Sequence, residues 1–159
     1  MPNKRTKSDG AKAGGKTSYV YPQLHSDISK AVLPDIKNVW YNKKGSKNYN
    51  NEYSTHVRGS FRCDNENCSK RGWSSGKVAI QIRGYPTNGY KAVVFNQRCR
   101  SCDTLGALTL DEKSYVDRVA YRLKKWAGIE LEEPPHGHGG SPPHRRDLCE
   151  GCRLGVCTA

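Results

Sequence analysis

The chain has 159 residues and a net charge of +12, and only 35 % of its residues are hydrophobic. This length fits one domain with tails, and the composition leaves room for only a small apolar core. No apolar run reaches the about 20 residues of a membrane span, so membrane insertion is not expected. Lys and Arg outnumber Asp and Glu only within residues 1–128, and such a basic domain predicts a polyanion, most often nucleic acid, as its partner.

The first third of the chain divides into two segments. Residues 1–18 are mainly Lys, Gly, Ser and Ala, which cannot bury enough apolar surface to offset the entropy of ordering, so we expect a disordered basic tail. Residues 19–55 are expected to form a basic and aromatic N-terminal extension. Apolar residues four apart in this extension predict a short amphipathic helix, and they are Leu24, Ile28 and Val32.

Lysines and aromatic residues alternate irregularly over residues 37–53. Single-stranded nucleic acids are bound by such mixtures, because rings stack on bases and ammonium groups neutralise phosphates. A loop rich in Asn and Gly, anchored to the body by its aromatic side chains, explains the same composition. The candidate contacts with RNA are Lys37, Trp40, Tyr41, Lys43, Lys44 and Lys47, continued by Arg98 and Arg100.

From His56 the pattern becomes that of β-strands. Residues 56–63 predict a short strand, and residues 78–82 alternate between apolar and other side chains with a period of two. The segment 84–89 ends in Asn-Gly, a strong turn signal. Residues 77–98 are therefore predicted to form an antiparallel hairpin that leads directly into Cys99.

Residues 111–127 predict the main helix. Its apolar stripe contains Tyr115, Val119 and Leu123, and Asp111 is a suitable N-cap. Together these elements predict a small α+β domain over residues 56–159, with antiparallel β-hairpins, zinc knuckles and one main helix.

Seven cysteines and one histidine form three clusters with the spacing of zinc ligands. Eight such residues are sufficient for two tetrahedral zinc ions, since each structural site takes four. A disulfide framework is the alternative, but an odd cysteine count and a start without an apolar signal segment favour a reducing, intracellular location in the cytoplasm, the nucleus or both. The candidate ligands are Cys63, Cys68, Cys99, Cys102, His144, Cys149, Cys152 and Cys157.

The spacing leaves open how the ligands divide between the two ions. The favoured pairing puts the first four cysteines on one zinc, because the predicted hairpin brings them together, and the last four ligands on the other. In the alternative, Cys149 and Cys152 complete the first site. His56 is the spare ligand if His144 does not bind.

The chain from His56 onward resembles the 3CxxC-type zinc-binding family, which includes receptor-transporting proteins, zygote arrest proteins and many fungal proteins. The first knuckle departs from the family pattern, because its two cysteines have four residues between them in place of two. The resemblance rests on Phe61-Arg62-Cys63, Gly72-Trp73-Ser74-Ser75, Phe95-Asn96-Gln97-Arg98-Cys99, residues 114–121 with Trp126, and His144 with residues 149–157.

The resemblance implies two functions. Zygote arrest proteins bind RNA through this domain, whereas receptor transporters act as chaperone-like partners of membrane proteins. The charge and the segment 37–53 favour binding of single-stranded RNA, with a protein-interaction or trafficking adaptor as the alternative. We expect no enzyme, because catalytic zinc needs an open coordination position and the ligand count closes both sites.

Overall fold

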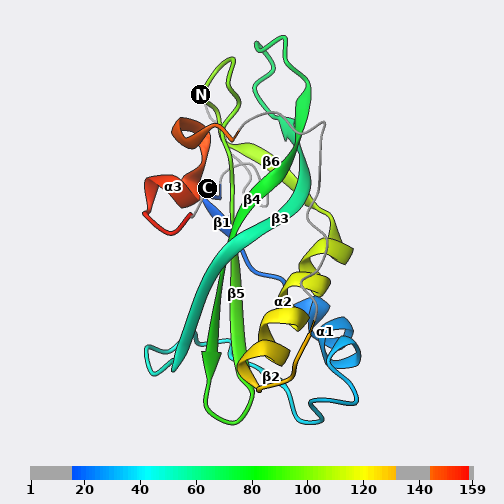
Figure 1. The fold of residues 1–159 in the computed structure, drawn as a ribbon. Helices are drawn as coiled ribbons and strands as arrows, with labels where there is room; N and C mark the ends of the chain where they lie inside the picture. The colour runs from blue at the N-terminus through cyan, green and yellow to red at the C-terminus, as the bar shows by residue number, and fades with distance from the viewer. Residues whose placement is uncertain (1–15, 132–143, 158–159) are drawn as a thin grey trace.

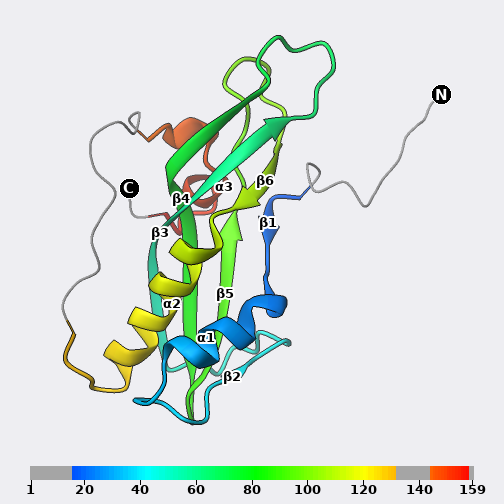
Figure 2. The same cartoon turned by 90° about the vertical axis from the view of Figure 1, so that its right-hand side faces the viewer.

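The computed structural model describes residues 16–131 and 144–157, and within them the chain forms a sheet with two helices on one face and a short helix on the other (Figures 1 and 2). The strands are β1 Ser18–Tyr19, β2 Trp40–Tyr41, β3 Asn51–Cys63, β4 Gly72–Tyr85, β5 Gly89–Phe95 and β6 Gly106–Leu110. The helices are α1 His25–Ala31, α2 Glu112–Trp126 and α3 Glu150–Arg153. The predicted small α+β fold is confirmed.

The sheet has six strands in the order β1-β5-β4-β3-β6, and β2 pairs with β5 in parallel outside this order. Its long strands β3 and β4 twist across each other in Figure 1, and at one end of the molecule they extend past α1 and α2. The main apolar core lies between the sheet and the pair α1 and α2, where side chains such as Ile28, Ile80 and Val119 are fully buried. A second, smaller core, around Ala79, Phe95 and Cys149, lies on the α3 face.

The predicted hairpin is confirmed as the antiparallel pair β4 and β5, in which Tyr85 lies opposite Gly89. β4 begins at Gly72, ahead of the predicted start at residue 77. The positive φ angles of the turn fall on Thr87 (66°) and Asn88 (67°), and Gly89 is already a strand residue. A Cβ atom at Gly89 would lie 2.4 Å from the Trp40 ring, so this glycine allows the ring to approach the strand closely.

The N-terminal segment is part of the same core as the rest of the chain. α1 buries its apolar side chains with those of β3, β4, β5 and α2. The boundary predicted between residues 55 and 56 falls inside β3, because the strand begins at Asn51. Of the expected disordered tail, residues 1–15 lie outside the described residues. The backbone carbonyls of Lys16 and Thr17 accept hydrogen bonds from Asn96, and Ser18 pairs with Phe95.

α2 confirms the predicted main helix. The carboxylate of Asp111 accepts a hydrogen bond from the backbone N–H of Ser114 at 3.2 Å, which caps the helix N-terminus. The predicted stripe of Tyr115, Val119 and Leu123 is buried against the sheet. None of the helices in the described ranges has the length and apolarity required to cross a bilayer.

Candidate metal centres

The first candidate metal centre lies at the end of the molecule where β3 and β4 project. Cys63 is the last residue of β3, and Cys68 lies in the loop that leads to β4. Cys99 and Cys102 come from the connection between β5 and β6. Their sulfur atoms all lie within 4.8 Å of one another, with 3.6 Å between the Sγ atoms of Cys63 and Cys102 and 3.8 Å between those of Cys68 and Cys99.

These separations fit zinc and exclude disulfides. In a regular tetrahedron with Zn–S bonds of about 2.3 Å, the sulfur atoms are about 3.8 Å apart. A disulfide would bring the two sulfur atoms to about 2.05 Å, and all seven cysteines are free thiols. Four thiols at the edge length of a zinc tetrahedron define a structural site with cysteine ligands alone.

The second candidate metal centre lies on the α3 face of the sheet. His144 Nε2 is 3.4 Å from Cys152 Sγ and 3.6 Å from Cys157 Sγ, and Cys149 completes the group. A tetrahedral ion with Zn–N of about 2.0–2.1 Å and Zn–S of about 2.3 Å places nitrogen and sulfur about 3.6 Å apart. The donor set and its spacing therefore fit a second zinc ion.

The small residue Gly151 seats the second site on the sheet. A Cβ atom there would lie 2.6 Å from the side chain of Ala79 on β4, so only glycine allows this approach. The backbone N–H groups of Val156 and Cys157 both donate to the Gly151 carbonyl, which folds the last ligand back onto the site. The sequence predicts the ligands, but not this docking of α3 on β4.

The two groups are those of the favoured pairing, because Cys149 and Cys152 lie with His144 and Cys157 and do not complete the first site. The expectation of two zinc sites is confirmed. His144 belongs to the second group, whereas His56, the spare ligand, lies beside it with its Nε2 at 3.4 Å from Cys157 Sγ. Burial, helped by the nearby His144, lowers the pKa of His56 to about 4, so this imidazole is neutral at pH 7. In the tautomer with a proton on Nε2, it donates a hydrogen bond to the Cys157 sulfur.

The metal-free thiols differ in acidity. Burial raises the pKa of Cys149 to about 12, whereas hydrogen bonds with Thr104 lower the pKa of Cys102 to about 6. Zinc binds thiolates, so an ion at the second site must displace the proton of a buried thiol. Metal binding there releases protons and weakens as the pH falls.

The two centres are connected to each other by residues next to their ligands. Arg98 precedes Cys99, and its Nε atom lies 3.0 Å from the carboxylate of Glu150, which follows Cys149. The backbones pair at the same place, since Arg98 N–H donates to Leu148 O at 2.8 Å and Glu150 N–H donates to Asn96 O at 3.0 Å.

The predicted RNA contacts lie in two separate regions. Trp40 and its neighbouring lysines lie near β2 at one end of the sheet, whereas Arg98 and Arg100 flank the first zinc ligands at the other end (Figure 1). Residues 37–47 therefore do not form with Arg98 and Arg100 the one continuous surface that the sequence predicts.

Two of the predicted contacts have structural roles in place of RNA contacts. The guanidinium of Arg98 is paired with Glu150 and also donates to the Asp103 carbonyl, so it is not free for phosphate. Tyr41 packs edge-on against Tyr90, with ring centroids 5.4 Å apart, and its hydroxyl is buried. The ring of Tyr41 therefore anchors the loop and is not available for stacking on bases.

The sequence did not point to a cavity that lies between the two zinc sites and has a volume of about 230 Å³. The sequence contains only two weak signals of this cavity, which are the cationic residues next to zinc ligands and a tryptophan among the Ser and Gly residues at the start of β4. The lining residues are Lys70, Gly72, Trp73, Ser74, Ser75, Lys77, Gln97, Arg100, His144, Arg145 and Leu148.

The comparisons identify the family. A family model of 3CxxC zinc-ribbon type, described as a zinc-binding domain, matches residues 56–155, and the chain belongs to this family. Neither a curated protein nor a solved structure matches the chain. The two complete sets of four ligands described above agree with this assignment.

Proposed function

We propose that the protein is a non-catalytic, zinc-stabilised domain that binds single-stranded RNA. One observation carries the proposal: a set of exposed lysines near β2 has no carboxylate partner among the described residues, and we call this set the β2 lysines. They are Lys37, Lys43, Lys44 and Lys47.

Two acidic residues close in sequence to the β2 lysines are already paired with other cations. Asp35 pairs with Lys124 at 3.6 Å, and Glu52 pairs with Arg83 at 2.8 Å. Neither of these carboxylates forms an ion pair with the β2 lysines, and a polyanion whose phosphates take the place of carboxylate partners would be attracted to this end of the sheet.

Trp40 supplies a fixed aromatic surface beside these lysines. Its side chain is 41 % exposed, and its indole N–H donates to the backbone carbonyl of Thr87 at 2.9 Å. The ring rests against Gly89, so it loses little freedom when a base stacks on it. Base stacking on an aromatic side chain contributes about 1–3 kcal/mol and tolerates any base, which suits single-stranded RNA.

The metal centres support a structural role for zinc. Each group supplies four protein ligands, and a tetrahedral ion with four such ligands has no position left for water or substrate. We therefore assign the zinc ions to stability of the fold and the RNA contact to the surface.

The test measures binding of a fluorescein-labelled oligouridylate to the zinc-loaded full chain at several salt concentrations. Lys43→Ala with Lys44→Ala is expected to weaken binding and to reduce the slope of log K against log salt by about 1.4, because each single-strand phosphate contact contributes about 0.7. Lys113→Ala with Lys125→Ala removes the same charge from α2 and is the matched control, expected to leave the slope unchanged.

A second variant separates stacking from charge. Trp40→Ala should weaken single-stranded RNA more than duplex RNA and leave the salt slope unchanged, while the melting temperature shows whether the fold is intact. Absence of RNA binding by the wild-type protein at low salt would refute the proposal. The alternative, a protein-interaction or trafficking adaptor, predicts a defined protein partner that remains bound after RNase treatment.

A further inference from the structure

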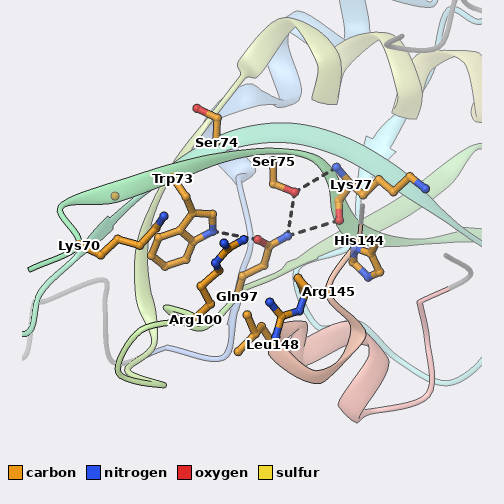
Figure 3. Close-up of a pocket in the computed structure, with 11 residues that line it drawn as sticks. Lys70, Trp73, Ser74, Ser75, Lys77, Gln97, Arg100, His144, Arg145 and Leu148 are labelled. Atoms are coloured by element: carbon orange, nitrogen blue, oxygen red, sulfur yellow. Dashed lines mark hydrogen bonds between the residues drawn. The ribbon is translucent and has the colours of Figure 1, made fainter. Parts of the chain in front are cut away.

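The cavity between the two zinc sites has walls from both of them. Lys70 lies two residues after Cys68, and Arg100 lies between Cys99 and Cys102, so the first site positions both cations. Arg145 and Leu148 form the opposite wall, and they adjoin the ligands His144 and Cys149 of the second site. Figure 3 shows Lys70 and Arg100 reaching toward the ring of Trp73, whereas the Lys77 side chain extends away from it.

The described residues that line the cavity include several cations and no carboxylate. Among the described residues, no acidic group lies within ion-pair distance of Lys70 or Arg100, whereas Arg145 pairs with the exposed Asp147 at 3.0 Å. Two cations without a carboxylate partner on one side of a cavity offer a binding site for an anion such as a phosphate.

The floor of the cavity is fixed before any ligand arrives. Gln97 is only 8 % exposed, and its amide oxygen accepts a hydrogen bond from the indole N–H of Trp73 at 3.0 Å. Its amide nitrogen donates to the hydroxyl of Ser75 at 3.0 Å. Trp73 is also stacked on Phe61, with ring centroids 5.0 Å apart and an angle of 8° between the planes. The indole is therefore held rigidly beside the two cations.

We propose that this cavity is a nucleotide-binding site, in which Lys70 and Arg100 bind the phosphate and Trp73 contacts the base. The inference rests on the proposed function, in which the site holds one unit of the RNA strand. A volume of about 230 Å³ is smaller than the about 300–1,000 Å³ of pockets for drug-sized ligands, so one nucleotide unit enters and the rest of the strand lies outside.

The zinc sites offer a different explanation for these cations, and this explanation is testable. A Zn²⁺ ion with four thiolates carries a net charge of about −2, which nearby cations balance. If that were their only role, loss of Lys70 and Arg100 would weaken zinc retention and leave nucleotide binding unaffected. The nucleotide site predicts the reverse.

The test is a titration of the zinc-loaded full chain with adenosine 5′-monophosphate, followed by NMR of the indole N–H signals. The Trp73 indole signal is expected to shift on binding, because its N–H lies in the cavity floor. Lys70→Gln with Arg100→Gln should raise the dissociation constant at least tenfold while both zinc ions are retained. Lys113→Gln with Lys125→Gln, which removes two charges from α2, should leave it unchanged.

Each other outcome bears on the site separately from the RNA function. Loss of zinc in the variant Lys70→Gln with Arg100→Gln, without a change in nucleotide affinity, overturns the site. Binding of a phosphoserine peptide without binding of the nucleotide also overturns it.

Oligouridylate binding separates the cavity from the RNA function. If this binding is lost in Lys43→Ala with Lys44→Ala but unchanged in Lys70→Gln with Arg100→Gln, the RNA function stands and the cavity has no part in it. A shift of Trp73 by the nucleotide without oligouridylate binding supports the site and refutes the RNA function.

Discussion

The guanidinium of Arg98 lies 3.0 Å from the carboxylate of Glu150, and this pair joins residues that adjoin ligands of two different zinc sites. Glu150 is 2 % exposed, so its charge has little access to water. Arg153 contacts the same carboxylate at 3.3 Å. A buried carboxylate between two guanidinium groups fixes the second zinc site against the first, in addition to the backbone pairing of Gln97 with Cys149.

Arg98→Ala is therefore expected to destabilise the protein rather than weaken RNA binding. Removal of one partner of a buried ion pair costs about 3–5 kcal/mol, and the remaining contact with Arg153 keeps the effect near the lower end. Denaturant unfolding of the zinc-loaded protein measures this change. Arg153→Ala, which removes the more exposed partner, is the control and should cost less. An equal loss of stability in both variants would contradict the structural role of Arg98. A loss of RNA affinity in folded Arg98→Ala would also contradict it.

Zinc content is expected to be two ions per chain. Because the sites are separate, Cys102→Ser should lose the first ion and Cys152→Ser the second, each without the other. Structural zinc contributes about 10–16 kcal/mol of apparent binding free energy, so chelation should unfold the chain. Native mass spectrometry gives the metal count, and circular dichroism follows unfolding. One zinc in the wild-type protein, or seven reactive thiols in its folded zinc-loaded form, would refute the two-site arrangement.

The sequence predicted the parts of this protein that depend on local spacing. The ligand clusters, the turn before Gly89 and the helix that begins after Asp111 are all encoded by neighbouring residues. The contacts over long distances in the chain were not predictable in the same way. Arg98 looked like a phosphate ligand because its partner, Glu150, is 52 residues away in the sequence.

Long-range packing also explains why Trp40 and Tyr41, both predicted to contact RNA, differ in their exposure to solvent. Trp40 and Tyr41 are adjacent, but strand β2 turns successive side chains to opposite sides. Trp40 remains partly exposed, whereas Tyr41 packs against Tyr90. A composition of lysines and aromatic residues does not specify which ring faces the solvent, and neither does it reveal a cavity whose walls come from separate zinc sites.

The two histidines at the second site should respond differently to substitution. His56→Ala is expected to retain both zinc ions and to lose about 1.5–3 kcal/mol of stability, the contribution of a hydrogen bond to a charged group, here the Cys157 thiolate. His144→Ala removes a ligand and should lose the second ion. Metal content and the visible spectrum of the cobalt-substituted protein distinguish these results. Two tetrahedral ions in His144→Ala would instead show that His56 serves as a ligand.

Acid should destabilise the fold in part through His25, which lies away from both zinc sites on α1. Burial lowers the pKa of His25 below 6.5, and its Nδ1 lies 2.9 Å from the Tyr90 hydroxyl. As the pH falls below 6.5, the His25 imidazole takes up a proton more readily in the unfolded chain than in the folded protein. The contribution of His25 to stability, which is present above that pH, is therefore lost as the pH falls. His25→Gln should therefore lose less stability than the wild-type protein as the pH falls below 6.5. A measured His25 pKa above 6.5 by NMR would reverse the sign.

Thr87→Gly is expected to stabilise the protein by about 1 kcal/mol. Thr87 has a φ of 66°, where its β-branched side chain is strained, and glycine adopts this conformation without that strain. The gain is limited because glycine also increases the freedom of the unfolded chain. The bond from the Trp40 indole goes to the backbone carbonyl of residue 87, so it is kept. Thr87→Ala retains a Cβ atom and is the control, expected to gain less. Thermal unfolding of both variants measures the difference, and equal melting temperatures would show that the turn stores no strain at this residue.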